Sequence, residues 1–151
     1  MNIKAQDVAY HFLATANECG SFISNLKLQK LLYYAQAWHL AIFDAKLFSE
    51  KFEAWVHGPV IPAIYHRYKE YGTKPILEEN AEKLSLDTER ESFFEELIQE
   101  YFGLDAYTLE LLTHREDPWL NARKGIPPFQ PSKKKISELD MKQYYGNRLK
   151  D

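Results

Sequence analysis

The chain has 151 residues, the length of one domain, and its 45% apolar and 15% aromatic residues are enough to build a core. The net charge of −3 argues against a uniformly basic nucleic-acid-binding protein, and one cysteine excludes an intramolecular disulfide or a zinc–thiolate cluster. No stretch approaches about 18 apolar residues, and residues 1–16 lack the apolar core of a signal peptide. We therefore expect a cytoplasmic protein that does not span a membrane.

The first two predicted helices follow from apolar spacing. In residues 5–16 the apolar side chains recur along one helical stripe, and Gly20 ends this helix. Ser24 is a good N-cap for a second helix, residues 26–42, whose apolar side chains lie on most of its sides. Such a helix packs against several neighbours, so we expect it to be the central helix of the fold.

The segment that follows has the spacing of a strand. Apolar and polar residues alternate over residues 52–56, which predicts a strand. Residues 47–48 supply its expected partner, with residues 49–51 as the turn. Gly58 and Pro59 are expected to end the strand, because proline has no N–H to donate to a sheet.

The rest of the chain is expected to be helical apart from loops and a candidate short strand at residues 75–77. Apolar spacing, capping residues and terminating glycines predict five further helices. These are residues 61–71 followed by Gly72; a helix from Asp87 to Gly103; a short helix from Asp105 to Leu112; one turn from Asp117, with Pro118 at its first position; and residues 136–149, after the proline-rich loop 125–131. No repeat or long linker divides the sequence. We predict one mainly α domain over residues 1–151: a compact bundle of about five to seven helices around the long central helix, with a small β-hairpin or three-stranded sheet at its side.

Charge is unevenly placed along the chain. Residues 78–100 contain nine acidic residues against two basic ones, a balance of −7, and residues 132–151 contain six basic against three acidic, a balance of +3. Glu91, Glu95 and Glu100 point outward on their predicted helix. Both segments are typical of solvated surface, and the alternative is an acidic face that binds a basic protein partner or mimics nucleic acid.

The sequence lacks the standard catalytic signatures, with no glycine-rich phosphate loop, nucleophile elbow or His-Glu-x-x-His. His57, His66 and His114 are nine and then 48 residues apart, a spacing typical of no metal site. Glu95 and Glu96 are neighbours on a helix and point apart, which argues against a shared acid–base pair. We expect no enzyme, metal or cofactor, and keep a metal-dependent hydrolase built on the three histidines as an alternative.

Two segments stand out as candidate sites. The first is residues 54–62, Ala-Trp-Val-His-Gly-Pro-Val-Ile-Pro, with a tyrosine one turn further on, and the second is residues 112–119, Leu-Thr-His-Arg-Glu-Asp-Pro-Trp. Each can be a folding device, a binding site, or both. The candidate partner contacts here are Trp55, His57, Tyr65, His114 and Trp119. The residues expected to shape the turns are Gly58, Pro59, Pro62, Asp117 and Pro118.

Residues 25–39, Asn-Leu-Lys-Leu-Gln-Lys-Leu-Leu-Tyr-Tyr-Ala-Gln-Ala-Trp-His, resemble the long helix of the Panacea domain, the SocA-like antitoxin family. The likeness keeps its order and spacing over roughly residues 8–123, and the segment from Gly125 onward matches less distinctly. Its later parts are Leu47-Phe48, Glu53-Ala54-Trp55, residues 58–62, Tyr65, Tyr71-Gly72, and His114 with Asp117-Pro118-Trp119, similar to a family His-x-x-x-Pro-Trp motif.

The resemblance implies an antitoxin that is encoded with a growth-inhibiting toxin, often on prophages, and neutralises it by direct protein–protein contact. Family members accompany unrelated toxins, including enzymes that block translation by modifying tRNA, so the domain does not name the toxin. A proteolytic adaptor that delivers the toxin to an ATP-dependent protease is the main alternative. Regulation of its own promoter and self-association stay open. A motif shared by members with different toxins is expected to hold the scaffold, with partner choice elsewhere.

Overall fold

The structure is a computed structural model that describes residues 2–149. In these residues there are seven α-helices, one 3-10 helix and one two-stranded sheet, which confirms the predicted mainly α fold. In chain order the elements are α1 (Ala5–Cys19), α2 (Asn25–Phe43), β1 (Glu53–Trp55), β2 (Gly58–Val60), α3 (Pro62–Arg67), η1 (Lys69–Tyr71), α4 (Thr88–Tyr101), α5 (Ala106–Thr113), α6 (Asp117–Ala122) and α7 (Glu138–Arg148). No helix within residues 2–149 has the length and hydropathy that crossing a bilayer requires.

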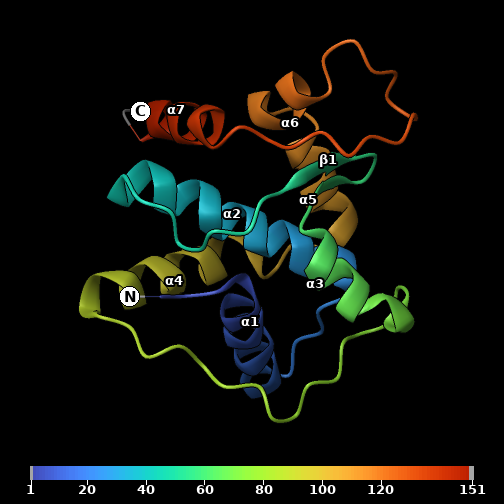
Figure 1. Ribbon diagram of the computed structural model, residues 1–151. Helices are drawn as coiled ribbons and strands as arrows, with labels where there is room; N and C mark the ends of the chain where they lie inside the picture. Colours follow the sequence, from blue (N-terminus) through green and yellow to red (C-terminus); the bar gives the residue numbers. More distant parts are fainter. Residues whose placement is uncertain (1, 150–151) are drawn as a thin grey trace.

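Helix α2 is the centre of the molecule. Helices α6 and α7 lie on one side of it, α1 and α4 lie on the other, and the sheet and α3 lie toward one end (Figure 1). Fourteen of its 19 residues are buried, including Asn25, Gln29, Lys30 and Gln36. A helix surrounded in this way has no solvent face on which to place its polar side chains, so each of them needs a partner inside the protein.

Three of the predicted N-caps form as expected. Ser24, Asp87 and Asp105 each accept a hydrogen bond from the backbone N–H three residues later. Gly20 ends α1 in the left-handed conformation at φ 67°. Local signals of this kind depend on only a few neighbouring residues, which is why the sequence places these boundaries well.

The pairing of the small sheet was predicted wrongly. β1 pairs with β2 in an antiparallel hairpin, with Ala54 opposite Pro59, so residues 58–60 are the partner strand and residues 47–48 are not. Gly58 and Pro59 therefore do not end the strand but belong to the sheet. Proline is tolerated because Ala54 O, which an N–H at residue 59 could otherwise have reached, accepts from Arg123 Nη1 at 2.8 Å, while the Ala54 N–H donates to Lys134 O at 2.8 Å. One bridge from Glu53 to Lys135 adds a partial third strand.

Three helix predictions also need correction. Residues 61–71 form α3 and then the 3-10 helix η1, in place of one continuous helix. Asp117 is not a cap, since Glu116 occupies the N-cap position and α6 begins at Asp117. The last helix begins at Glu138, capped by Ser137, because Ile136 donates its N–H to Phe52 O at 2.9 Å beside the sheet. Residues 75–77 form no strand, and Ile76 makes a single backbone bond to Ile23 O at 2.9 Å.

Candidate functional site

The segment from Gly58 to Tyr65 is held by polar side chains of α2. Gln29 Oε1 accepts a hydrogen bond from the Ile61 N–H at 2.9 Å, and Asn25 Nδ2 donates to Tyr65 O at 2.9 Å. Gln29 Nε2 donates to Asn25 Oδ1 at 3.1 Å, so the two amides orient each other. These bonds fix the backbone of the hairpin exit and of α3 on the central helix.

Gln36 holds the preceding loop in the same way. Its Oε1 accepts from the Leu47 N–H at 2.7 Å and its Nε2 donates to Phe48 O at 2.6 Å. The segment predicted to pair with β1 is therefore bound to α2, and its backbone groups are already satisfied there. This is the physical reason why residues 47–48 do not join the sheet.

Lys30 is the most unusual of these side chains. It is fully buried, and its Nζ donates to Pro59 O at 3.2 Å. Burial lowers the pKa of Lys30 to about 7, and the charge of Glu110 partly opposes that shift. A lysine with this environment is at the border between its charged and neutral forms near neutral pH.

Gly58 is required where β2 passes over Lys30. Its φ is +105°, a conformation that side chains rarely adopt, and a Cβ at this position would lie 2.6 Å from Lys30 Cε and 2.9 Å from Thr113 Oγ1. The predicted role of Gly58 in shaping the turn thus gains a specific reason, which is the close approach of the backbone to two buried side chains.

The second motif packs against the hairpin from the other side. Trp119 Nε1 donates to Trp55 O at 2.9 Å, and the His114 ring stacks on the Trp119 ring with centroids 4.1 Å apart. Arg123 covers the same indole at 5.2 Å and donates from Nη1 to Ala54 O at 2.8 Å. Burial lowers the pKa of His114, so the ring is favoured in its neutral form. The Trp119 side chain is almost wholly buried, so it holds β1 against α6 and presents little surface to a partner.

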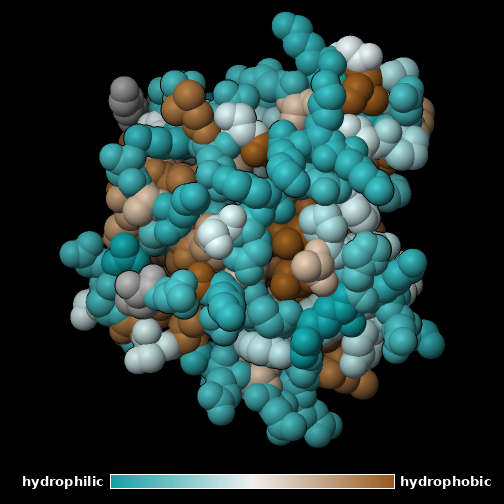
Figure 2. Space-filling view, viewed as in Figure 1, coloured by the Kyte–Doolittle hydropathy of each residue, from teal (hydrophilic) through white to brown (hydrophobic). Residues whose placement is uncertain are grey.

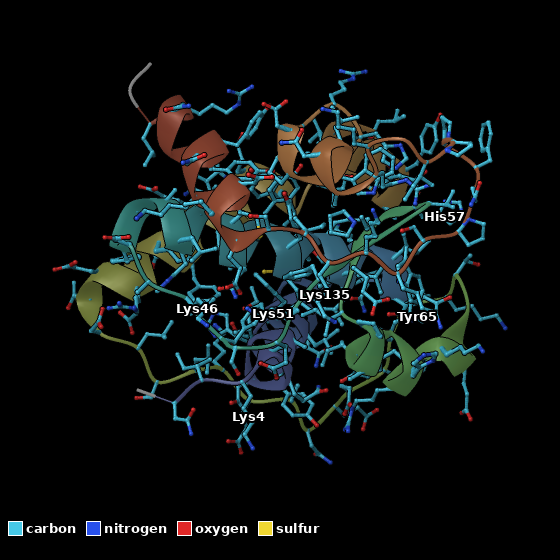
Figure 3. The ribbon with its side chains drawn as sticks, turned by 45° about the horizontal axis from the view of Figure 1, so that its top comes forward. Lys4, Lys46, Lys51, His57, Tyr65 and Lys135 are labelled. Atoms are coloured by element: carbon cyan, nitrogen blue, oxygen red, sulfur yellow. The ribbon has the colours of Figure 1, made fainter. Side chains whose placement is uncertain are left out.

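The other three candidate contacts of the motifs form what we call the hairpin surface: Trp55, His57 and Tyr65. The rings of Trp55 and Tyr65 meet edge-on with centroids 5.0 Å apart, and both are half-buried. His57 is exposed at the tip of the hairpin, with its Nδ1 3.0 Å from Glu110 Oε1. Figure 3 shows His57 and Tyr65 at the same end of the molecule.

Glu91, Glu95 and Glu100 lie on α4 and together are called the acidic face, with Glu91 and Glu95 beside one hollow and Glu100 beside another. All three are exposed, and none forms an ion pair with another residue of the described range 2–149. Helix α4 lies across the molecule from the β-hairpin (Figure 1). The structure therefore does not bring the predicted contact residues together into one site but places them on two surfaces.

The three histidines of the hydrolase alternative do not make a metal site. Across residues 2–149, no three His, Cys, Asp or Glu side chains come close enough to hold a metal ion. His57 pairs with Glu110, His114 stacks on Trp119, and His66 lies exposed beside the Tyr65 ring.

Sequence reasoning missed a buried cluster around Glu116. Tyr34 and Tyr145 donate their hydroxyls to Glu116 Oε1 at 2.6 and 2.8 Å, and burial raises the pKa of this carboxyl. The cluster joins α2, α7 and the corner between α5 and α6. The sequence feature that could have revealed this cluster is the pair Tyr33-Tyr34 on a helix with no polar face. A tyrosine hydroxyl that is buried there needs a hydrogen-bond partner.

The comparison with known protein families decides which family this is. Residues 28–120 match the family described as "Antitoxin SocA-like, Panacea domain". The chain belongs to this family. The matched stretch runs from α2 through the hairpin to Trp119, so it contains both motifs. Residues 1–27 and 121–151 lie outside it, and one domain over residues 1–151 stays a prediction.

A curated relative supports the same family. The Panacea chain is 40% identical over 76 residues to Antitoxin SocA from Caulobacter vibrioides (strain NA1000 / CB15N). The aligned stretch is 50% of this chain and 40% of that protein, so the chain spans well under half of the relative that it matches. No solved structure matches the chain.

Proposed function

We propose that this Panacea protein is an antitoxin that neutralises a cognate growth-inhibiting toxin by binding it directly. The observation that carries the proposal is its membership of the antitoxin SocA-like family. The 40% identity to a protein named Antitoxin SocA agrees with it. A toxin that blocks translation, a prophage origin and a cytoplasmic location are the finer parts of this proposal.

The interactions of the side chains with shifted pKa values support binding over catalysis. Lys30, His114 and Glu116 all have shifted pKa values, which is typical of active sites. Here, however, Lys30 donates to a backbone carbonyl and Glu116 accepts from two tyrosines, while His114 stacks on a buried indole. These interactions hold the scaffold, so the surfaces left for function are the exposed ones.

The test of this proposal is co-expression with the growth-inhibiting protein encoded beside this chain. We expect growth to be restored and the two proteins to co-purify as a stable complex. Toxin half-life then separates a blocker from a proteolytic adaptor, because only an adaptor shortens it. Persistent growth arrest with both proteins present, and no complex, would refute an antitoxin role of either kind.

We predict that the acidic face guides the toxin to the antitoxin. Changing Glu91, Glu95 and Glu100 to lysine should slow association by about tenfold or more at low salt, because complementary charge mainly raises on-rates. The dissociation rate should change little. Stopped-flow or surface plasmon resonance measurements at two salt concentrations check this, with the same residues changed to glutamine as the control for lost charge without reversal. Equal on-rates for wild type and the lysine variant at low salt would contradict it.

A further inference from the structure

The loop after α6 carries an aromatic side chain at its tip. Residues 127–130 form a β-turn in which the Gln130 N–H donates to Pro127 O at 3.0 Å, and Phe129 is the third residue of the turn. We call these residues the Phe129 turn. The Phe129 side chain is 89% exposed. A phenylalanine held in water at this level is uncommon, because its burial is favourable.

The Phe129 turn is held in place by a buried arginine. Arg123 is 4% exposed, and its Nη2 donates to Pro127 O at 2.9 Å and to Gln130 O at 2.5 Å. Its Nη1 donates to Ala54 O of β1 at 2.8 Å. One guanidinium thus ties both ends of the turn to the sheet. A side chain on a fixed turn loses little conformational entropy on binding, which favours recognition.

The other end of the loop is fixed along β1. Lys134 O accepts the Ala54 N–H at 2.8 Å, and Ile136 donates its N–H to Phe52 O at 2.9 Å. The loop is therefore anchored before and after its exposed tip. Figure 2 shows apolar atoms at the upper right, where Figure 1 places this loop.

An apolar hollow lies beside the loop, close to the hairpin surface. Its volume is about 560 Å³, and Trp55, Val56, His57, Pro131, Ser132 and Lys133 line it. The loop and its two ends carry four exposed lysines, Lys124, Lys133, Lys134 and Lys135, and Lys133 lines the hollow itself. None of these four forms an ion pair with any other residue in the part of the chain that the structure describes. The combination is an apolar hollow beside a loop that carries unpaired positive charge.

We propose that the Phe129 turn and the hollow form one docking surface for a partner protein that presents an apolar side chain between carboxylates. Phe129 fits an apolar depression on that partner, the partner's apolar side chain fills the hollow, and the lysines pair with its carboxylates. The charge of this surface is opposite to that of the acidic face on α4, which lies on another part of the molecule (Figure 1). The docking surface therefore binds an acidic part of a partner protein, whereas the acidic face attracts a basic one.

Peptide selection on the purified full chain tests the chemistry of the occupant. A displayed random-peptide library should yield acidic sequences that contain an aromatic or large aliphatic residue. Their affinity is then measured by fluorescence anisotropy with synthetic peptides, beside versions with the apolar residue changed to serine and with the acidic residues changed to lysine. Both altered peptides should bind at least about tenfold more weakly, since each removes one half of the recognition.

Variants of the protein locate the binding. Phe129→Ala should weaken the acidic peptides by about tenfold or more, whereas Phe22→Ala should leave them unchanged, although Phe22 is also an exposed phenylalanine, at 73%. Arg123→Lys keeps the charge but not the fork of donors, so it should weaken binding while hydrogen exchange of residues 125–131 accelerates. Lys133→Glu with Lys134→Glu should remove the salt dependence of binding.

The same measurements can overturn the proposal. Selection of basic or neutral peptides, no enrichment, or equal binding by wild type and Phe129→Ala would each do so. A concentration-dependent dimer that Phe129→Ala abolishes would instead identify a second copy of the chain as the occupant, and binding of oligonucleotides through the lysines would identify nucleic acid. None of these results depends on the toxin, so the antitoxin proposal stands or falls separately.

Discussion

Replacing Gly58 by alanine is expected to lower the free energy of unfolding by roughly 2–5 kcal/mol, the combined cost of a left-handed backbone and of overpacking. The φ of +105° strains any residue with a Cβ, and the new Cβ would lie 2.6 Å from Lys30 Cε. Lys30 is fully buried, so it has no room to move aside. For a chain of this size the midpoint of thermal unfolding should fall by roughly 10 °C.

Two other glycines provide matched controls for this measurement. Gly20 also has a positive φ, of +67°, but nothing lies within 4 Å of its Cβ position, and Gly103 has both open space and a φ that is not positive. Urea unfolding of the three alanine variants should therefore rank them in the order Gly58, Gly20, Gly103, from most to least destabilised. If Gly58→Ala costs no more than Gly20→Ala, the close approach to Lys30 and Thr113 contributes nothing.

Lys30→Met is expected to remove a pH dependence of stability. In the unfolded chain Lys30 has an ordinary pKa near 10.5, and in the folded protein burial lowers it to about 7. Between these two values the unfolded state binds more protons, so the wild-type free energy of unfolding rises with pH by up to roughly 1.4 kcal/mol per unit. Below about pH 7 both states are protonated and the full cost of burying the charge, on the order of 4–5 kcal/mol, is present.

Urea unfolding at several values between pH 7.5 and 9.5 measures this slope. The wild type should gain roughly 2–3 kcal/mol over that range and Lys30→Met should not, while the exposed-site variant Lys46→Met should retain the wild-type slope. The buried Tyr33, Tyr34 and Tyr145 have raised pKa values and stay neutral across the range. Parallel curves for wild type and Lys30→Met would show that the ammonium is not desolvated in the folded protein.

The parts of the fold that the sequence predicts well are those with local causes. Ser24, Asp87 and Asp105 cap their helices, and α2 is central because its apolar side chains surround it. Strand pairing was mispredicted because it depends on distant residues. Whether residues 47–48 or 58–60 join β1 is decided by Gln36, which already binds the backbone of the first segment.

The residues that organise the candidate site were harder to predict from the sequence. Lys30, Glu116 and Arg123 are polar, and sequence patterns place such residues at the surface by default. Lys30 and Arg123 are buried and Glu116 is half-buried, and each bonds groups that lie far away in the chain. Of the predicted contact residues, the structure leaves His57 and the acidic face exposed but buries Trp119. A tryptophan in a motif is thus no indication of exposure until its N–H partner, here Trp55 O, is known.

The hydrogen bonds from α2 to the hairpin exit leave the side chains of that segment free to differ. Asn25, Gln29 and Lys30 all reach main-chain atoms of the segment from Pro59 to Tyr65. A carbonyl or an amide N–H is the same in almost every residue type, so these bonds do not depend on which side chains the segment displays. An exposed position of this segment, such as 63, can therefore be varied freely in a library while the backbone keeps its course. The same scaffold can in this way be adapted to successive partners without being rebuilt.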